Sequence, residues 1–473
     1  MLAAGVVILA ATVVVVAGQV VHYPPVASNI NNITFALSGN GAPGIFNSST
    51  TPDAQYGTYN WCNMPHVRLR EYKQPPKRYS LEYVEVIQRH HKRTPYASNT
   101  FFKEDVAWSC DKAGATFGST RYVFTLKLSA YVQWQTYTDS QNPWTNSVGP
   151  GFPGSSCQFP QITSEGLEDS ITHGSDLRSV YASRLGLGSK IDPATASIRV
   201  TTNVITSQVA SGLVAGLFPS SKSDDTIVNV QSATYDSLEP TYSCNTASNL
   251  RSDYTTGSSG AVWQAHLAEA AKVYAQLDKV SGIATQDSAG WHSSFDHYYD
   301  NLSAKQCHGK SLPCSLNYTS VCVSQELANT VYRLGNWEYS YLYRDAPASA
   351  KYSALRYGAW VLELRGHLQD QVNKNSGLTL YLQIAHDGSM SALLGFLQVE
   401  QMVWPGMCIV FELYSTSSGK LTKNYFIRVL WGGQPMRTST PLGTLDMISL
   451  DVFFSYIDTM IGNATSLFEG CNQ

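Results

Sequence analysis

Charge is scarce in this chain of 473 residues, because charged side chains make up 14% of it, against roughly 25% in typical soluble domains. The formal net charge is −3, so no excess of basic residues would draw the protein to nucleic acid or to an anionic membrane. We therefore expect neither nucleic acid nor a membrane as a partner, and a site for an anion has to be built locally. Hydrophobic residues reach 43%, which is enough for a large core and argues against a disordered chain.

Long apolar runs are missing after residue 18, and no internal repeat is visible. Residues 1–18 are apolar throughout and end in Ala17 and Gly18, as expected for a secretory signal with a small-residue cleavage point. No Lys or Arg precedes the run, which weakens the match to a signal peptide. A membrane anchor is the alternative, but the run falls short of the ~20 residues that a spanning helix needs. We predict a signal peptide over 1–18 and a secreted, extracellular protein.

Zinc-site spacing is also missing, because none of the nine cysteines forms a C-x-x-C pair. The cysteines therefore predict several disulfides and one leftover thiol, which we expect to be a buried small side chain rather than a nucleophile. Their connectivity stays open, although the close spacing of Cys307, Cys314 and Cys322 predicts one local bridge among them. Five N-x-S/T sequons predict glycans: Asn32, Asn47, Asn301, Asn317 and Asn463.

Hydrophobic patterns divide the rest of the chain into strand-forming and helix-forming parts. Residues 19–78 are rich in Ser, Asn, Thr, Pro and Gly and predict an extended N-terminal arm. Short apolar or β-branched runs predict strands over 83–88, 122–131, 197–202, 378–385, 409–414 and 425–431. Apolar residues at helical spacing predict helices over 163–185, before residue 217, and over 323–343. The Pro/Gly/Ser-rich stretch 138–160 predicts a long loop, functional or a lid.

The order of these elements predicts the fold class. Strands and helices alternate at first, helical spacing then prevails over 220–372, and strands return afterwards. This order favours an α/β fold with a mainly parallel, doubly wound sheet and an inserted α-helical cap. We predict an α/β domain built from 79–219 and 373–473, and a predominantly α cap subdomain over 220–372.

The segment richest in basic and potentially reactive side chains is Arg89-His90-His91-Lys92-Arg93-Thr94-Pro95. It begins where the strand over 83–88 ends. Ligands of open α/β sheets bind at the carboxyl ends of strands. Guanidinium groups match phosphate oxygens in pairs, and a neutral histidine held among them can attack phosphorus. A solvated basic turn is the alternative, but an R-H-x-x-R-x-P string arises by chance on the order of once in a thousand such chains. The segment therefore favours a phosphate site.

A second polar pair, His386-Asp387, follows the strand over 378–385. It would place an imidazole that binds phosphate beside a carboxylic acid. The dipeptide alone fits an ordinary loop carboxylate equally well. Its weight comes from the first motif, because both follow strands whose ends can meet at one edge of a sheet.

These segments resemble the histidine acid phosphatases, branch two of the histidine phosphatases, which includes the fungal phytases. The family signature R-H-G-x-R-x-P corresponds to residues 89–95, and its H-D pair to residues 386–387. The family's Q-L-T-x-x-G helix, which leads to L-R-x-x-Y, is similar to the stretch from Gln161-Ile162-Thr163 through Gly166, Gly174 and Leu177-Arg178 to Tyr181. Residues 409–413 and 428–435 resemble its C-terminal strands, so the resemblance runs from about residue 80 to 440.

The resemblance implies an acid phosphatase that hydrolyses phosphomonoesters through a covalent phosphohistidine. By it, His90 is the nucleophile, Arg89, Arg93 and His386 hold the phosphate, and Asp387 is the general acid. No metal or other cofactor is expected, because arginines neutralise the transferring phosphoryl group. The implied partners are a small phosphomonoester as substrate and inorganic phosphate as product and inhibitor.

Two positions depart from the family pattern. The family glycine after the nucleophile is His91 here, which either points away harmlessly or enters the pocket as a third imidazole. A further phosphate-binding arginine of the family falls on Ile205. Arg199, at the end of the preceding strand, either takes over that role or packs its stem and pairs with a carboxylate. We predict that Arg199 contributes to phosphate binding, and that Lys92 is a charge available for substrate specificity.

Two other segments carry weaker signals. The cluster Asp296-His297-Tyr298-Tyr299-Asp300 could hold a cation, but we expect an ordinary helix surface. Trp404-Pro405 is predicted to be packing. Because of the departures at His91 and Ile205, a secreted binding or structural protein on the same fold is the alternative to an enzyme. The choice among phytate, sugar phosphates and nucleotides stays open.

Overall fold

The computed structural model describes residues 20–42, 62, 64–99, 108–110, 116–123, 126–133, 137, 139, 141–143, 155–221, 226–404, 408–418 and 422–473. The predicted signal peptide, the sequon at Asn47 and most of the predicted loop over 138–160 lie outside these residues. No helix in the described ranges is long and apolar enough to cross a membrane.

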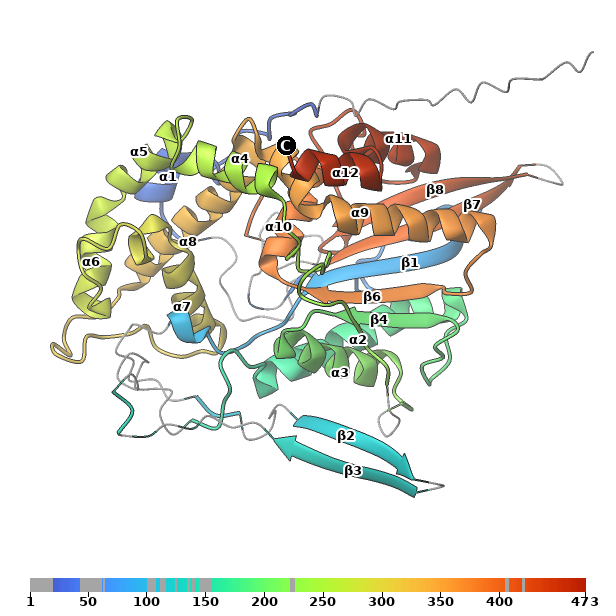
Figure 1. The fold of residues 1–473 in the computed structure, drawn as a ribbon, viewed down its shortest axis with the longest axis horizontal. Helices are drawn as coiled ribbons and strands as arrows, with labels where there is room; N and C mark the ends of the chain where they lie inside the picture. The colour runs from blue at the N-terminus through green and yellow to red at the C-terminus, as the bar shows by residue number, and fades with distance from the viewer. Residues whose placement is uncertain are drawn as a thin grey trace, which may run out of the picture.

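A single large sheet forms the centre of the molecule, in the order β10-β8-β7-β1-β6-β4-β5, with β9 paired to β8 (Figure 1). Its strands are β1 (Ser80–Arg89), β4 (Ala196–Val200), β5 (Asn229–Val230), β6 (Leu380–Ala385), β7 (Ile409–Ser418), β8 (Thr422–Trp431), β9 (Gln434–Pro435) and β10 (Ile448–Ser449). This architecture confirms the α/β fold class.

The sheet is mixed rather than mainly parallel. Strands β1, β6, β4 and β5 pair in parallel, whereas β1 with β7, β7 with β8, and β8 with β10 pair antiparallel. The reason is the short connection between β7 and β8, because parallel neighbours need a crossover of a dozen or more residues. The parallel half carries the strand ends at which a ligand is expected.

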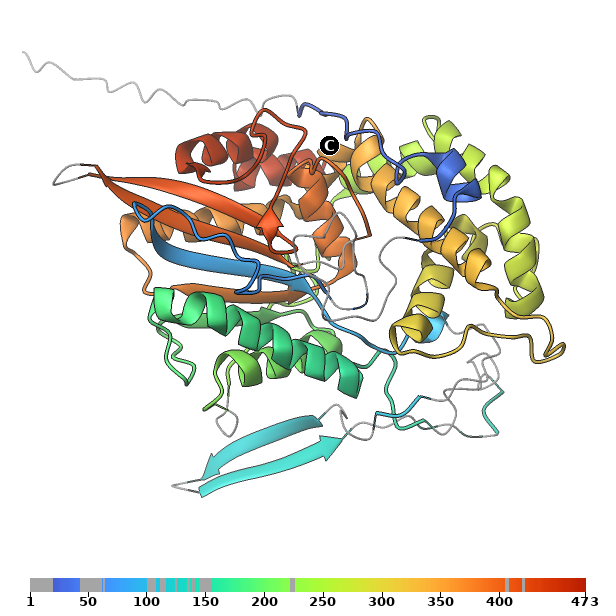
Figure 2. The ribbon, with the colours of Figure 1, turned by 180° about the vertical axis from the view of Figure 1, so that it is seen from behind.

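Helices cover both faces of the sheet (Figures 1 and 2). α2 (Ser164–Leu185) and α3 (Val204–Leu217) cover one face. α9 (Ser349–Asn373), α10 (Asp387–Phe396), α11 (Leu450–Ile461) and α12 (Ala464–Cys471) lie on the other side. Side chains of β1 alternate between the two cores: Val84 and Val86 face α2 and α3, and Tyr83 and Ile87 face the opposite core.

A helical lobe extends from one end of the sheet (Figure 1). It contains α4 (Asn245–Thr255), α5 (Ala261–Glu269), α6 (Ala271–Ser281), α7 (Asp296–Cys307) and α8 (Gln325–Ser340), with a π-helical turn at Tyr341–Asp345 and α1 (Ile33–Ser38) packed against α8. The prediction of a helical block is thus confirmed at the level of secondary structure. Its proposed boundaries at 220 and 372 stay a prediction, and both β5 and α9 fall within that block while they contact the sheet.

The strand predicted over 122–131 is wrong, because the chain turns back within it. β2 (Thr116–Val123) and β3 (Leu126–Gln133) form an antiparallel hairpin in which Val123 pairs with Leu126. The hydrophobic pattern continues across the turn, so it gave no sign of the break. The hairpin is a separate sheet that lies apart from the central one (Figure 2).

Four disulfides join eight of the cysteines: Cys62–Cys307, Cys110–Cys157, Cys244–Cys471 and Cys314–Cys322. They confirm the predicted local bridge, and the remaining Cys408 is buried.

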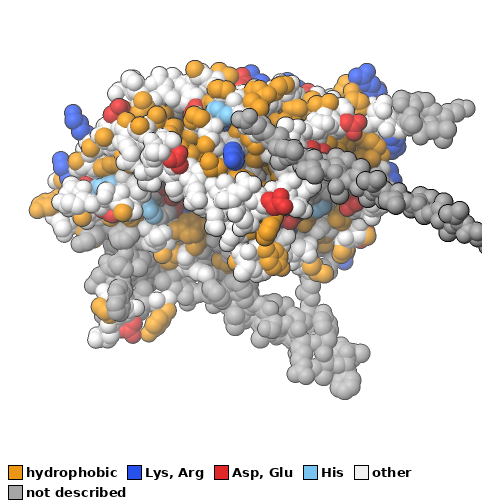
Figure 3. Space-filling view, turned by 45° about the horizontal axis from the view of Figure 1, so that its top comes forward, with side chains coloured by type: hydrophobic (Ala, Val, Ile, Leu, Met, Phe, Trp, Pro, Cys, Tyr) orange, Lys and Arg blue, Asp and Glu red, His pale blue; other side chains and the backbone are white. Residues whose placement is uncertain are grey.

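The sequon prediction is wrong at Asn301. This side chain is fully buried in α7, donates to the carbonyl of Asn99 and accepts from Lys305, so no glycan fits there. Asn32, Asn317 and Asn463 are exposed. In the face seen in Figure 3, basic and acidic side chains are scattered among hydrophobic and polar ones, in keeping with the low net charge.

Candidate active site

The two sequence motifs meet at the carboxyl ends of neighbouring parallel strands. Arg89, the last residue of β1, pairs with Ala385, the last residue of β6. The next residues, His90 and His386, therefore leave the sheet side by side, with ring centroids 5.5 Å apart. Both motifs thus reach one place, as the topology of a parallel pair requires.

His90 is held in the tautomer that a nucleophile needs. Its Nδ1 lies 3.0 Å from the backbone carbonyl oxygen of His91, and because a carbonyl can only accept, Nδ1 carries the hydrogen. The Nε2 lone pair is then directed to the other side of the ring. Burial, and next the charges of Arg89 and Arg93, hold the pKa of His90 well below its usual value, which favours the neutral ring with its free lone pair.

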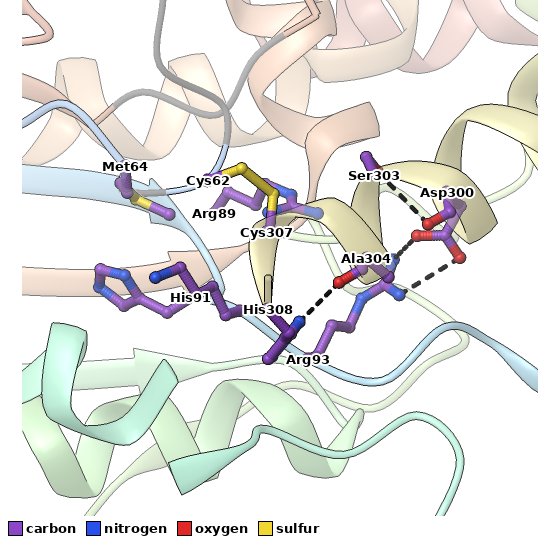
Figure 4. A pocket seen from close by; sticks show the side chains of 11 residues that line it. Cys62, Met64, Arg89, His91, Arg93, Asp300, Ser303, Ala304, Cys307 and His308 are labelled. Carbon is purple, nitrogen blue, oxygen red and sulfur yellow. Dashed lines mark hydrogen bonds and ion pairs between the residues drawn. A yellow bond between two sulfur atoms is a disulfide. The ribbon is translucent and has the colours of Figure 1, made fainter. Parts of the chain in front are cut away.

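Arg93 is directed toward His90 by a carboxylate of the helical lobe. Its Nε lies 3.4 Å from His90 Nε2, while its Nη2 pairs with Asp300 Oδ1 on α7 at 2.9 Å, a contact drawn in Figure 4. Asn99 Nδ2 donates to the other oxygen of Asp300 at 2.6 Å, and the guanidinium lies over the ring of Tyr96, 4.3 Å from its centroid. Several contacts therefore fix the orientation of Arg93.

Asp300 corrects the interpretation of its segment as a helix surface. The side chain of Asp300 is buried at the site, whereas Asp296, at the start of α7, is exposed. The sequence gave no indication that Asp300, one helical turn after Asp296, would be buried beside Arg93. Among the described residues, no cluster of three or more His, Cys, Asp or Glu side chains could hold a metal ion.

Asp387 begins α10 and lies between the arginines and an indole. Its Oδ1 is 4.0 Å from His90 Nε2 and 3.4 Å from Arg89 Nε, and its Oδ2 accepts from Trp404 Nε1 at 3.1 Å. Burial opposes the charged form, but Arg89, Arg93 and Trp404 outweigh it and lower the pKa of Asp387.

Trp404 contributes more than the packing that was expected of it. Its ring is stacked between Tyr299 and Tyr339, with centroids 3.9 Å away on each side. This sandwich fixes the direction of the indole N–H, which points at Asp387. Nothing local in the sequence marked this contact, because the three aromatic residues come from separate segments.

His386 completes the set of groups around His90. Its Nε2 lies 2.9 Å from Thr201 Oγ1 and 3.4 Å from Glu239 Oε2. Burial lowers the pKa of His386 to about 4, with Arg93 and Arg89 acting in the same direction and Asp387 opposing them. A phosphate group placed between these residues would favour the protonated ring.

The segment from Gln161 to Gly166 supports the loop that follows β1. The amide of Thr94 donates to the carbonyl of Gln161 at 2.9 Å, and the amide of Thr163 donates to the carbonyl of Lys92 at 3.3 Å. A Cβ atom on Gly166 would lie 2.0 Å from the Lys92 carbonyl oxygen, so only glycine permits this approach. The residues that resemble the family's helix therefore support the loop that follows β1.

Lys92 was predicted to be a charge available for substrate specificity, but it forms an ion pair within the protein. Its Nζ lies 3.1 Å from Asp169 on α2, and its side chain is buried. The prediction is corrected accordingly, because the charge is compensated within the support of the loop.

His91 is turned away from His90 and packs on α2. Its Nε2 lies 3.3 Å from His173 Nδ1, and the ring of His173 stacks on His66, which contacts Asp176 at 2.8 Å. Burial lowers the pKa of His91 well below its usual value. These contacts agree with the alternative in which His91 points away harmlessly, because its ring packs on His173 rather than on His90.

The prediction that Arg199 binds phosphate is wrong. Its Nη1 pairs with Glu363 at 2.6 Å and its Nη2 with Asp236 at 2.9 Å. The reason is the alternation of β4: Ile198 and Val200 face α2 and α3, so Arg199 points to the opposite face of the sheet, under α9. Ile205 is fully buried in the α3 core. Of the residues expected to hold phosphate, Arg89, Arg93 and His386 lie together around His90.

Comparisons with known proteins agree with this geometry. The model of the family described as histidine phosphatase superfamily (branch 2) matches residues 80–431. The 2-phosphoxylose phosphatase 1 of Danio rerio is 24% identical over 469 residues, which cover 91% of this chain and 90% of that protein. The lysophosphatidic acid phosphatase type 6 of Bos taurus is 24% identical over 386 residues, which cover 80% of this chain and 82% of that protein.

A solved structure shows the same fold. The multiple inositol polyphosphate phosphatase of Bifidobacterium longum, in complex with inositol hexasulfate, matches with a TM-score of 0.52 at 10% identity. The match covers 80% of this chain and 92% of that one. At this identity the likeness concerns the fold alone.

Proposed function

We propose a mechanism for this chain from one premise: it belongs to branch 2 of the histidine phosphatase superfamily, and it is a phosphoric monoester hydrolase. In this mechanism the phosphoryl group passes through a covalent phosphohistidine on His90, and Asp387 is the proton donor. The observation that carries the proposal is the position of His90 Nε2, which lies 3.4 Å from Arg93 and 4.0 Å from Asp387.

In the first step, the Nε2 lone pair of His90 attacks phosphorus and the bond from phosphorus to the ester oxygen breaks. The hydrogen bond from Nδ1–H to the His91 carbonyl stabilises the positive charge that the ring acquires. Arg89, Arg93 and a protonated His386 neutralise the phosphoryl oxygens, and preorganised charges of this kind supply much of the stabilisation of such transition states.

Asp387 donates a proton to the leaving alkoxide in the same step. Its pKa is lowered by Arg89 and Arg93, and a phosphate dianion bound to these arginines offsets their charge and raises the proton affinity of the carboxylate again. In the second step, the carboxylate takes a proton from water, the water oxygen bonds to phosphorus and the bond from phosphorus to His90 breaks.

Activity at acidic pH follows from this division of roles. His90 stays neutral in acid because its pKa is depressed, while Asp387 must be protonated before it can act. The four disulfides favour an oxidising compartment, secreted or lumenal. Asn32, Asn317 and Asn463 are the proposed glycan sites in the described part of the chain.

Trapping the intermediate tests the proposal. After rapid mixing with ³²P-labelled p-nitrophenyl phosphate and quenching in alkali, we expect an acid-labile, alkali-stable adduct on the wild-type protein and none on His90→Ala. Asp387→Asn is the matched control, because p-nitrophenolate is a good leaving group and the adduct should still form. Label on the His90→Ala protein would overturn the assignment.

A further inference from the structure

A pocket of about 410 Å³ opens beside His386, on the side of the helical lobe. Its lining includes Tyr96 near the first motif, His386 near the second, and Arg251, Arg356, Tyr343 and Tyr352 from the lobe and α9. Because Tyr96 contacts Arg93 and His386 contacts His90, this pocket adjoins the place of the reacting phosphoryl group. It is therefore positioned to receive the leaving group of the substrate.

Arg251 is held in this pocket by aromatic rings. Its guanidinium lies 5.4 Å from the ring centroid of Tyr343 and 5.6 Å from that of Tyr352, and its Nη1 is 3.4 Å from the Tyr352 hydroxyl. No carboxylate among the described residues forms an ion pair with it. Two rings thus fix the direction of a cation without neutralising its charge.

Arg356, on α9, brings a second guanidinium to the same pocket. It too has no ion pair with a carboxylate in the described part of the chain. The acid that lines the pocket is Glu239, which lies 3.4 Å from His386 and is 37% exposed. Arg251 and Arg356 differ in this respect from Arg199, which forms ion pairs with two carboxylates.

We infer that Arg251 and Arg356 bind a second anionic group, carried by the leaving group of the substrate. The inference rests on the proposed function and names its substrate class: compact phosphomonoesters whose alcohol part bears a carboxylate or another phosphate. Two guanidinium groups and several tyrosine hydroxyls suit such an oxyanion. The same lining disfavours a long alkyl chain, because burial of these polar groups against hydrocarbon would leave them without hydrogen bonds.

Two substrates that differ in a single group test the inference. In 3-phosphoglycerate a carboxylate stands where glycerol 3-phosphate has a hydroxymethyl group, and the rest of the two molecules is the same. We expect the wild-type protein at pH 5 to have a kcat/KM at least tenfold higher for 3-phosphoglycerate. The ratio of the two values should fall about threefold in Arg251→Gln or Arg356→Gln and approach one in the double variant.

Arg365→Gln is the matched control. Arg365 lies on α9 with Arg356, but it pairs with Asp458, so we expect this variant to keep the wild-type ratio. Equal kcat/KM values for the two compounds in the wild-type protein would overturn the inference. So would an equal loss on both compounds in the arginine variants, because the arginines would then serve the reacting phosphoryl group or the fold.

Binding to the His90→Ala protein separates this inference from the proposed function. Calorimetry should give a dissociation constant about tenfold lower for 3-phosphoglycerate than for glycerol 3-phosphate, and replacing both Arg251 and Arg356 by Gln in that background should remove the difference. If label from p-nitrophenyl phosphate is trapped on the His90→Ala protein, the proposed function fails while the binding comparison still decides on the pocket. Equal affinities would overturn the second anion site.

Discussion

Arginines on the two sides of the active site are held in different ways. Arg93, after β1, is paired with Asp300 and still presents its Nε to His90. Arg251, across the neighbouring pocket, is held by two tyrosine rings and keeps its charge available. Arg199, on β4, directs both of its Nη atoms to acceptors on the opposite face of the sheet. The partners of an arginine therefore decide whether its guanidinium orients another group, stays available for a ligand or stabilises the fold.

The largest expected effect concerns Asp387, whose carboxylate lies close to Arg89 and is influenced by the charges of Arg89 and Arg93. Asp387→Asn should lower kcat on glycerol 3-phosphate by roughly 10²–10⁴-fold, because an alkoxide leaving group needs a proton. The loss on p-nitrophenyl phosphate should be much smaller. Steady-state kinetics on the two substrates measure the difference, and equal losses would mean that Asp387 positions the phosphate or supports the loop.

Arg199 provides the next test, of stability rather than activity. Arg199→Met should lower the free energy of unfolding by about 3–5 kcal/mol, because Asp236 then stays buried without its partner. The inhibition constant for inorganic phosphate should not change. Arg365→Met is the control, since its pair with Asp458 is only half-buried, so water can replace the lost partner and the cost should be about 1 kcal/mol. Weaker phosphate inhibition together with unchanged stability would show that Arg199 binds phosphate.

Asp300 tests whether Arg93 depends on the helical lobe for its orientation. Asp300→Asn keeps the size of the side chain but removes a charge-assisted hydrogen bond worth ~1.5–3 kcal/mol. We expect kcat to fall at least tenfold, with a smaller change in the inhibition constant for phosphate. Asp451→Asn, at an exposed carboxylate on α11, should leave both values unchanged. Wild-type kcat in Asp300→Asn would show that the loop alone orients Arg93.

The smallest expected effect is at Trp404, which acts on Asp387 through one hydrogen bond. Trp404→Phe keeps an aromatic ring between Tyr299 and Tyr339 but removes the N–H that favours the carboxylate. The pKa of Asp387 should rise, so the general acid stays protonated to a higher pH and the alkaline limb of the kcat profile moves upward. A hydrogen bond worth about 1 kcal/mol corresponds to a shift of somewhat less than one pH unit. An unchanged or downward-shifted alkaline limb would contradict this role.

Much of the site could be predicted because the residues proposed to react lie in two short sequence motifs. His90 and Asp387 directly follow β1 and β6, and two parallel neighbours bring their carboxyl ends to one edge. The α/β class, the helical block and the local disulfide followed from periodicity and spacing. The antiparallel half of the sheet was not predicted, because the hydrophobic patterns of 409–414 and 425–431 indicate strands but not the direction in which the strands run.

The amino-acid sequence alone was enough to predict the fold class, the two motifs and the places of His90, His386 and Asp387, because these depend on residues that are neighbours along the chain. Only the tertiary structure decided that Arg199 belongs to a carboxylate network, that Asn301 is buried and that Asp300 orients Arg93. It alone also placed Trp404 on Asp387 and Arg251 beside Arg356. Each of these outcomes depends on which distant segment a side chain meets, and packing, not local pattern, sets that partner.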